Sequence, residues 1–139
     1  MDRNLPAWAG QYVGIPYVTH GRDRSGVDCW GLVQMISTEQ LANPWPPYEG
    51  VDWFKGQRAA VIGAHARAYA SLFRRVEPGG ERIGDAILMR MRGHPFHVGM
   101  VLDAGWMIHT SEAAGSVIET YRSMMWNKRI DGFYRYEEA

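Results

Sequence analysis

The chain has 139 residues, which is enough for one domain with a hydrophobic core and too few for two domains of ordinary size. Fifteen basic and fifteen acidic residues give a formal net charge of zero, which argues against binding to nucleic acid or to an anionic membrane. A single cysteine excludes an internal disulfide. Because no apolar run of signal-peptide or transmembrane type is present, we expect synthesis in the cytoplasm and no membrane insertion. From the chain length, we expect residues 1–139 to form one domain.

The first half of the chain has the apolar spacing of amphipathic helices. Asp28 stands where an N-cap would bond the free N–H groups at the start of the second helix. Glycine and proline interrupt residues 15–27, which predicts a loop, and the proline-rich residues 43–50 predict a surface connection. The predicted helices cover residues 5–13, about 29–41 and roughly 57–73.

In the second half the apolar period changes to that of strands. Residues 92–95 predict a turn, and residues 121–127 fit either a short helix or an irregular segment. Helices followed by a meandering antiparallel sheet indicate an α+β domain. The predicted strands cover residues 86–91, a hairpin of 96–102 and 106–110, and then 117–120 and 133–136.

Cys29 lies in the first turn of the second predicted helix. Its helical face also carries Leu32, Val33 and Ile36, so the thiol is expected to point towards the protein body. Unpaired N–H groups and the positive end of the helix dipole are expected to lower the pKa of this thiol and favour the thiolate. The alternative is that a lone cysteine is a small buried hydrophobic residue without chemistry.

The predicted hairpin carries two histidines on one face. With the turn centred on Asp103, Met100 faces Trp106 and His97 faces His109, with the Cβ atoms of the histidines about 5 Å apart. If this face packs against the cysteine helix, Cys29, His97 and His109 converge. His97 then accepts the thiol proton, and His109 orients His97. The N–H groups at the helix start are natural donors for an oxyanion.

Two other interpretations of these residues stay open. Paired histidines on a sheet can be ordinary polar residues at the edge of a face. Cys29, His94, His97 and His109 could also form a zinc site, because cysteine and histidine are the ligands that zinc prefers. Against zinc, the sequence has no Cys-x-x-Cys pair and no His-Glu-x-x-His helix.

Three segments form a combination that is more specific than any one of them. They are Ile15-Pro16-Tyr17 followed by Gly26-Val27-Asp28-Cys29-Trp30-Gly31-Leu32-Val33, then Gly84-Asp85-Ala86, then His97-Val98-Gly99-Met100-Val101-Leu102-Asp103 with Met107-Ile108-His109. The combination resembles the NlpC-type bacterial cell-wall cysteine peptidases. The resemblance implies a papain-like fold, in which N-terminal helices, including the cysteine helix, pack on a small antiparallel sheet.

The resemblance also implies site residues and a substrate class. Cys29 matches the nucleophile, His97 the base and His109 the orienting residue, and no cofactor or metal is implied. Tyr17 matches a tyrosine that helps to form the oxyanion and substrate pocket, although packing under the loop is an equal alternative. Asp28 and Trp30 flank the cysteine and are expected near the same pocket. Members of this family typically cut peptidoglycan stem peptides, commonly between D-glutamate and a diamino acid.

Two departures from the family pattern bear on specificity and setting. Trp30 stands where serine is common, and His20-Gly21 stands where two glycines are frequent. The tryptophan and the approach over residues 21–26 look most like members from phages, which implies a virion tail or tail-tip component that opens the wall locally. The alternatives are a structural tail component with little activity, and a stand-alone wall hydrolase or antibacterial effector.

Overall fold

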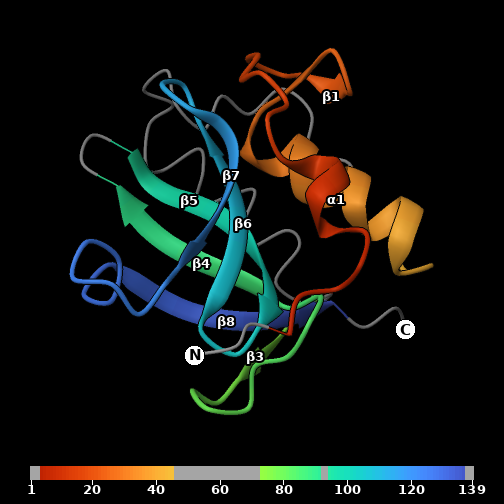
Figure 1. Cartoon of the computed structure of the whole chain (residues 1–139). Coiled ribbons are helices and arrows are strands. Elements are labelled where there is room, and N and C mark those ends of the chain that lie inside the picture. The colour runs from red at the N-terminus through yellow and green to blue at the C-terminus, as the bar shows by residue number, and fades with distance from the viewer. Residues whose placement is uncertain (1–3, 46–72, 92–93, 137–139) are drawn as a thin grey trace.

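The computed structural model describes residues 4–45, 73–91 and 94–136 (Figure 1). The third predicted helix and most of the proline-rich connection lie outside these residues, except for Phe73, which begins a strand. Within the described ranges, no helix is both long and apolar enough to span a membrane.

The described residues form one α-helix and two antiparallel sheets. The larger sheet has six strands in the order β3-β8-β4-β5-β6-β7, and α1 lies beside one of its faces (Figure 1). A small β1–β2 hairpin contacts α1. This is the predicted α+β arrangement. The elements are the 3-10 turn η1 (Ala9–Tyr12), β1 (Arg22–Asp23), β2 (Gly26–Val27), α1 (Cys29–Gln40), β3 (Phe73–Val76), β4 (Ala86–Met91), β5 (His94–Asp103), β6 (Trp106–Ser111), β7 (Gly115–Thr120) and β8 (Ile130–Tyr136).

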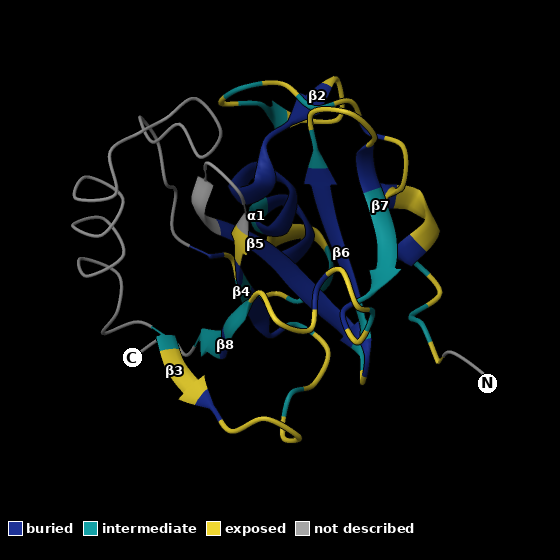
Figure 2. Ribbon diagram, turned by 90° about the vertical axis from the view of Figure 1, so that its left-hand side faces the viewer, coloured by how far each residue is buried: buried dark blue, intermediate teal, exposed yellow. Residues whose placement is uncertain are grey.

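The cysteine helix begins where the sequence predicts. Cys29, Leu32, Val33 and Ile36 are all fully buried, so the predicted apolar face is the one that packs. In Figure 2 this buried helix lies beside the buried strands β5 and β6. Complete burial of each of the three aliphatic side chains stabilises the fold by about 1.5–3 kcal/mol.

Two local predictions are wrong. The helix expected over residues 5–13 is only the single turn η1, because so short a segment bonds too few backbone groups to offset helix nucleation and Gly10 disfavours continuation. The turn expected over residues 92–95 is shorter, because His94 already pairs with Met91 in the β4–β5 ladder. Residues 121–127 form turns rather than a helix.

The β5–β6 hairpin has a different register from the predicted one. Met100 faces Ile108 instead of Trp106, because the turn is the two residues Ala104 and Gly105 and a bulge follows Val101. Gly105 has a φ of 91°, a conformation that glycine adopts without strain. The difference at Met100 is two residues, and side chains alternate along a strand, so the predicted faces are unchanged.

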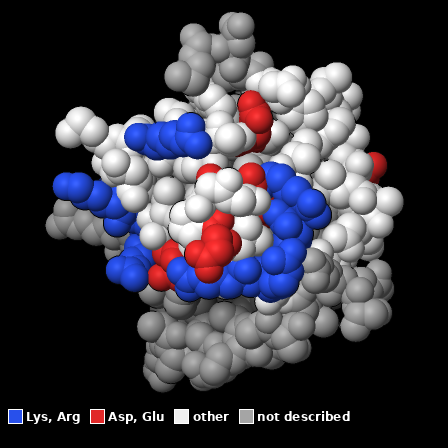
Figure 3. Space-filling model, turned by 90° about the horizontal axis from the view of Figure 1, so that it is seen from below, with Lys and Arg blue, Asp and Glu red and all other residues white. Residues whose placement is uncertain are grey.

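Each face of the large sheet carries its own apolar cluster. The face towards α1 includes Val98, Met100 and Ile108, together with the cysteine helix. The opposite face includes Met107, Trp126 and their neighbours. At the surface, acidic and basic side chains are mixed on the end seen from below (Figure 3). The described part of that end therefore offers no uniformly positive surface for a nucleic acid.

Candidate active site

The backbone around Cys29 is fixed by Asp28. Asp28 is extended, and its Oδ1 accepts a hydrogen bond from the N–H of Gly31 at 2.8 Å, which confirms the predicted N-cap. The same oxygen lies 2.6 Å from a guanidinium nitrogen of Arg22, and Oδ2 accepts from the N–H of His20 at 3.2 Å. Both carboxylate oxygens therefore bind protein donors, and they join the loop before the cysteine to the helix after it.

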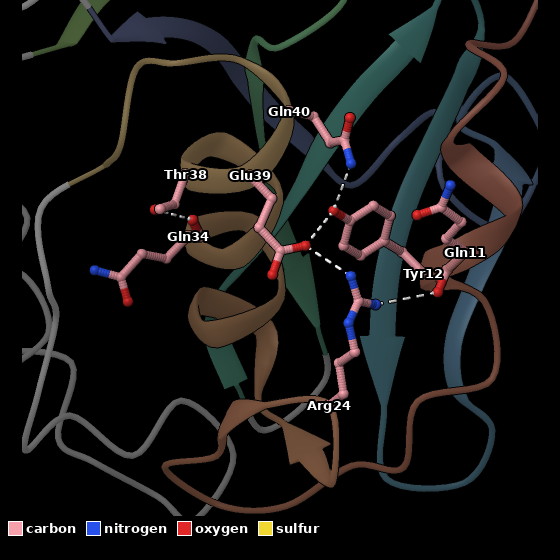
Figure 4. Close-up of polar contacts among 7 residues, drawn as sticks. All are labelled: Gln11, Tyr12, Arg24, Gln34, Thr38, Glu39 and Gln40. Carbon is pink, nitrogen blue, oxygen red and sulfur yellow. Dashed lines mark hydrogen bonds and ion pairs between the residues drawn. The ribbon is translucent and has the colours of Figure 1, made fainter.

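A second polar cluster holds the β1–β2 hairpin against the other end of α1 (Figure 4). The Tyr12 hydroxyl donates to Glu39 at 2.5 Å, and Arg24 donates to the same carboxylate oxygen at 2.7 Å. Gln40 donates to the Tyr12 hydroxyl at 3.0 Å, and Arg24 also donates to the carbonyl of Gln11 at 3.4 Å. These bonds tie η1, the hairpin and the helix together, so the loop that leads to the cysteine is anchored at both ends.

The two predicted histidines are in contact on one face of the sheet. Nε2 of His97 lies 2.9 Å from Nδ1 of His109, and both side chains are buried. The other ring nitrogen of His109, Nε2, contacts a carboxylate oxygen of Glu119 on the neighbouring strand β7. The structure therefore extends the predicted histidine pair to a chain of three side chains, His97, His109 and Glu119.

An indole ring covers the histidine pair. Trp126, which follows β7, stacks on His97 with ring centroids 6.1 Å apart and planes at 20°. The same ring meets His109 edge-on at 5.0 Å and 82°. Trp126 is only 4% exposed, so it shields the contact between the two imidazoles from solvent.

The predicted packing of the histidine face against the cysteine helix is wrong, because Cys29 and α1 pack with Val98 and Met100 on the other face of the sheet. The paired stretch of β5 and β6 runs from Met100–Ile108 to the turn. Further along β5, the N–H of Val98 donates a hydrogen bond to the sulfur of Cys29. Val98 directly follows His97, and α1 packs on both β5 and β6. The structure thus brings the helix start, and the thiol on it, to the strand that carries His97.

The electrostatics of the thiol differ from the prediction. Burial raises the pKa of Cys29 well above that of an ordinary thiol, and the negative charge of Asp28 raises it further. Hydrogen bonds from the N–H groups of Val98 and Trp30, and the charge of Arg22, lower it less. The expectation of a lowered pKa is wrong because complete burial outweighs the helix start. This direction of the pKa shift favours the protonated thiol of Cys29 over the thiolate.

The same physics keeps His109 neutral. Burial lowers the pKa of His109, while the hydrogen bond and charge of Glu119 act in the opposite direction without reversing the shift. A neutral imidazole has one donor nitrogen and one acceptor nitrogen. His109 can therefore accept a hydrogen bond from His97 only while it stays neutral.

The three other residues predicted near the pocket have different surroundings. Tyr17 forms a bridge with Val27, two residues before the cysteine, and packs at the edge of the core. Asp28 caps the helix as described above. Trp30 is buried against the rings of Trp45 and Phe73, with centroids 5.5 and 6.2 Å away, which leaves it little surface for a substrate.

The zinc alternative finds no support among the described residues. In that part of the chain, no group of three or more histidine, cysteine, aspartate or glutamate side chains is placed to hold a metal ion. The side chain of His94, one of the four suggested ligands, lies outside the described set.

Sequence reasoning missed Glu119 and Trp126. The alternation of β7 could have indicated Glu119, because Met107 faces Glu119 and His109 faces Val117, which puts Glu119 diagonally beside His109 on the same face. The sequence has no comparable signal for Trp126, because it lies in an irregular segment.

Comparisons with known proteins identify similar sequences and folds. The NlpC/P60 family model matches residues 14–135. Murein DD-endopeptidase MepS/Murein LD-carboxypeptidase of Escherichia coli K12 is 27% identical over 120 residues, which cover 85% of this chain and 54% of that protein. The chain thus spans about half the length of this relative.

Two solved structures share the fold. A lipoprotein-like NLP/P60 protein of Staphylococcus aureus Mu50 superposes with a TM-score of 0.65 at 19% identity, over 93% of this chain and 39% of that one. The NlpC/p60 domain of the peptidoglycan hydrolase SagA has a TM-score of 0.57 at 23% identity, over 94% of each chain. These similarities confirm the predicted fold class, with one helix packed on antiparallel sheets.

Proposed function

The chain belongs to the NlpC/P60 family, and we propose on this basis that it is a cysteine endopeptidase that hydrolyses amide bonds in peptidoglycan stem peptides. The observation that carries the proposal is the buried contact between His97 and His109, on the strand whose Val98 bonds to the sulfur of Cys29. In this proposal Cys29 is the nucleophile, His97 the general base and His109 the residue that orients it.

The raised pKa of the thiol decides how the reaction begins. Because Cys29 is protonated at rest, a stored thiolate does not start the reaction. Instead, Nδ1 of His97, the ring nitrogen turned away from His109, removes the thiol proton as the sulfur attacks the carbonyl carbon of the substrate amide. The amide π electrons move to the carbonyl oxygen, and a tetrahedral oxyanion forms.

The start of α1 supplies donors for this oxyanion. Within the first turn, the N–H of Gly31 is bound by the side chain of Asp28, and the N–H of Leu32 by its carbonyl. The N–H of Trp30 bonds to the Cys29 sulfur, so in this proposal the N–H of Cys29 is the oxyanion donor at the helix start, with the Tyr17 hydroxyl as a further candidate. The imidazolium of His97 then protonates the leaving amine as the C–N bond breaks. Water, deprotonated by His97, hydrolyses the thioester and restores the thiol.

The bond that is cut has two candidates. The family resemblance implies the amide between D-glutamate and a diamino acid, whereas the Escherichia coli relative is named a DD-endopeptidase and LD-carboxypeptidase. We propose the D-glutamyl bond. Defined muropeptides that contain only one of these bonds, analysed by mass spectrometry, distinguish the two.

The central experiment compares wild-type protein with Cys29→Ala on purified cell walls from several hosts. We expect new peptide termini with the wild type and none with the variant. His97→Ala should lose more activity than His109→Ala, because proton transfer is lost in the first and only orientation in the second. Glu112→Gln, a change at an exposed carboxylate outside the proposed site, is the control and should retain full activity. Equal muropeptide patterns from wild type and Cys29→Ala would refute the proposal.

A second test separates thiol chemistry from metal chemistry. Activity should survive EDTA and disappear after exhaustive treatment with iodoacetamide. Because Cys29 is fully buried, alkylation of the native protein should be slow compared with the unfolded chain. Loss of activity in EDTA alone would favour the zinc interpretation.

For the biological setting, we propose a component of a phage-type tail that acts with tail or tail-tip proteins. The support is the resemblance of Trp30 and the loop over residues 21–26 to phage-encoded members of the family. Purified particles should contain the protein, detected by mass spectrometry, and should open cell walls locally. Its recovery only as a free protein would favour a stand-alone hydrolase or effector. Recovery in particles without activity would favour a structural tail component.

A further inference from the structure

Glu119 joins the histidine pair from outside the predicted triad. It lies on β7, its carboxylate contacts Nε2 of His109, and its side chain is 38% exposed while that of His109 is 3% exposed. Among the described residues, the side chain of His109 has hydrogen-bond or ring contacts with His97 from β5, Glu119 from β7 and the ring of Trp126. Glu119 is therefore the charged group that acts on this imidazole.

The hydrogen bonds in this chain can run in only one direction when His109 is neutral. An ionised carboxylate only accepts hydrogen bonds, so Nε2 of His109 must be the nitrogen that carries the proton. Nδ1 of His109 is then the acceptor, and it receives the hydrogen bond from Nε2–H of His97. Because neutral His97 has its proton on Nε2, the lone pair is on Nδ1, the nitrogen that must accept the thiol proton.

We propose that Glu119 is a positioning residue that fixes the tautomers of both histidines, and so sets His97 as a base towards Cys29. The inference rests on the proposed function for its catalytic consequence, but the tautomers themselves are a property of the folded protein.

The opposite direction of the hydrogen bond between the two histidines shows what Glu119 prevents. Without an acceptor at Nε2, the proton of His109 can move to Nδ1 and point at His97. Nε2 of His97 would then have to accept, its proton would be on Nδ1, and it could not take the proton of Cys29. Burial of His109 favours its neutral form, which leaves this choice of tautomer to the partner at Nε2.

The test uses three variants of the full chain. Glu119→Ala removes the acceptor, Glu119→Gln keeps an amide oxygen that can accept the same hydrogen bond, and Glu112→Gln changes an exposed carboxylate of the same β6–β7 hairpin as the matched control. The ¹⁵N chemical shifts of labelled histidines report the tautomer of each ring directly and need no substrate. Thermal unfolding of each variant confirms that it is folded.

We expect His97 and His109 to be Nε2–H tautomers in the wild type and in Glu112→Gln. In Glu119→Ala the Nδ1–H form should appear at both rings, and kcat should fall about 10–100-fold with little change in KM, less than the ~10⁴-fold known when the direct partner of a catalytic histidine is lost. Glu119→Gln should recover part of this rate. Unchanged tautomers in a folded Glu119→Ala overturn the proposal. A wild type with the expected tautomers but no hydrolysis would instead refute the proposed function.

Discussion

Trp126 offers a test of how the covering of the histidine pair controls its protonation. Its ring lies on both imidazoles and is 4% exposed, so Trp126→Ala opens the pair to water. Trp126→Phe keeps an aromatic ring at the same place and is the matched control.

The cost in stability follows from packing and from one polar atom. Replacement of a buried tryptophan by alanine costs about 3–5 kcal/mol. The indole N–H of Trp126, however, is buried without a hydrogen-bond partner among the described residues, and such a group carries a penalty of about 1–3 kcal/mol. Because both variants remove that group, we expect Trp126→Ala to lose only about 3 kcal/mol and Trp126→Phe to lie within about 1 kcal/mol of wild type.

The effect on activity follows from the cause of the His109 shift. Burial is the largest reason why the pKa of His109 is lowered, so exposure of the ring should raise that pKa. Protonated His109 has no acceptor nitrogen for His97. The acid limb of the kcat profile should therefore move to higher pH in Trp126→Ala and stay in place in Trp126→Phe.

Urea unfolding measures the first effect, and muropeptide hydrolysis as a function of pH measures the second. An acid limb that is the same in Trp126→Ala and wild type, in a variant that is folded, would refute the link between burial and the protonation of His109. A shift of equal size in Trp126→Phe would also refute it, because the covering ring is kept there.

Three further predictions concern residues around the cysteine. Asp28→Ala removes the N-cap of α1 and the buried carboxylate that pairs with Arg22. The free energy of unfolding, measured by urea titration, should therefore fall by about 2–4 kcal/mol. A loss below about 0.5 kcal/mol would contradict the network around Asp28. Because the pKa of Cys29 is raised, the folded state keeps a proton that the unfolded chain loses at high pH. The free energy of unfolding should therefore fall as pH rises above the ordinary pKa of a thiol. Cys29→Ala should remove this contribution to the pH dependence of stability. Gly99→Ala would place its Cβ 2.9 Å from the carbonyl oxygen of Ile108 and 3.1 Å from the Cβ of His109. We expect this overpacking to lower both the melting temperature and kcat. A variant equal to wild type in both would show that β5 and β6 move apart without cost.

The parts of the fold that the sequence predicted depend on short-range patterns. The helix from Cys29 has four apolar residues at helical spacing and a good N-cap, and these two signals agree. The face shared by His97 and His109 was predicted from alternation, which survives an error of two residues in register. A one-residue error would have placed the histidines on opposite faces.

The parts that could not be predicted depend on contacts between distant segments. Trp126 covers the histidines through a turn segment without a periodic pattern, and Glu119 reaches His109 only once β7 is aligned with β6. The pKa of Cys29 depends on complete burial, which a helical position does not reveal. The local sequence indicates the helix start, whereas burial in the tertiary structure determines that the pKa of Cys29 is raised and not lowered.

The raised pKa of the Cys29 thiol and the lowered pKa of His109 are two results of the same burial. In an exposed site, a thiolate and an imidazolium can exist before the substrate arrives, because water stabilises both charges. Here the sulfur and both imidazoles are withdrawn from water, so formation of that ion pair is unfavourable until another group stabilises it. In the proposed reaction, a substrate carbonyl at the start of α1 is such a group, since the charge that leaves the sulfur passes to an oxygen facing the helix start. On this reasoning, deprotonation of Cys29 and attack on the carbonyl belong to one step, and the tautomer of His97 must already be correct when that step begins.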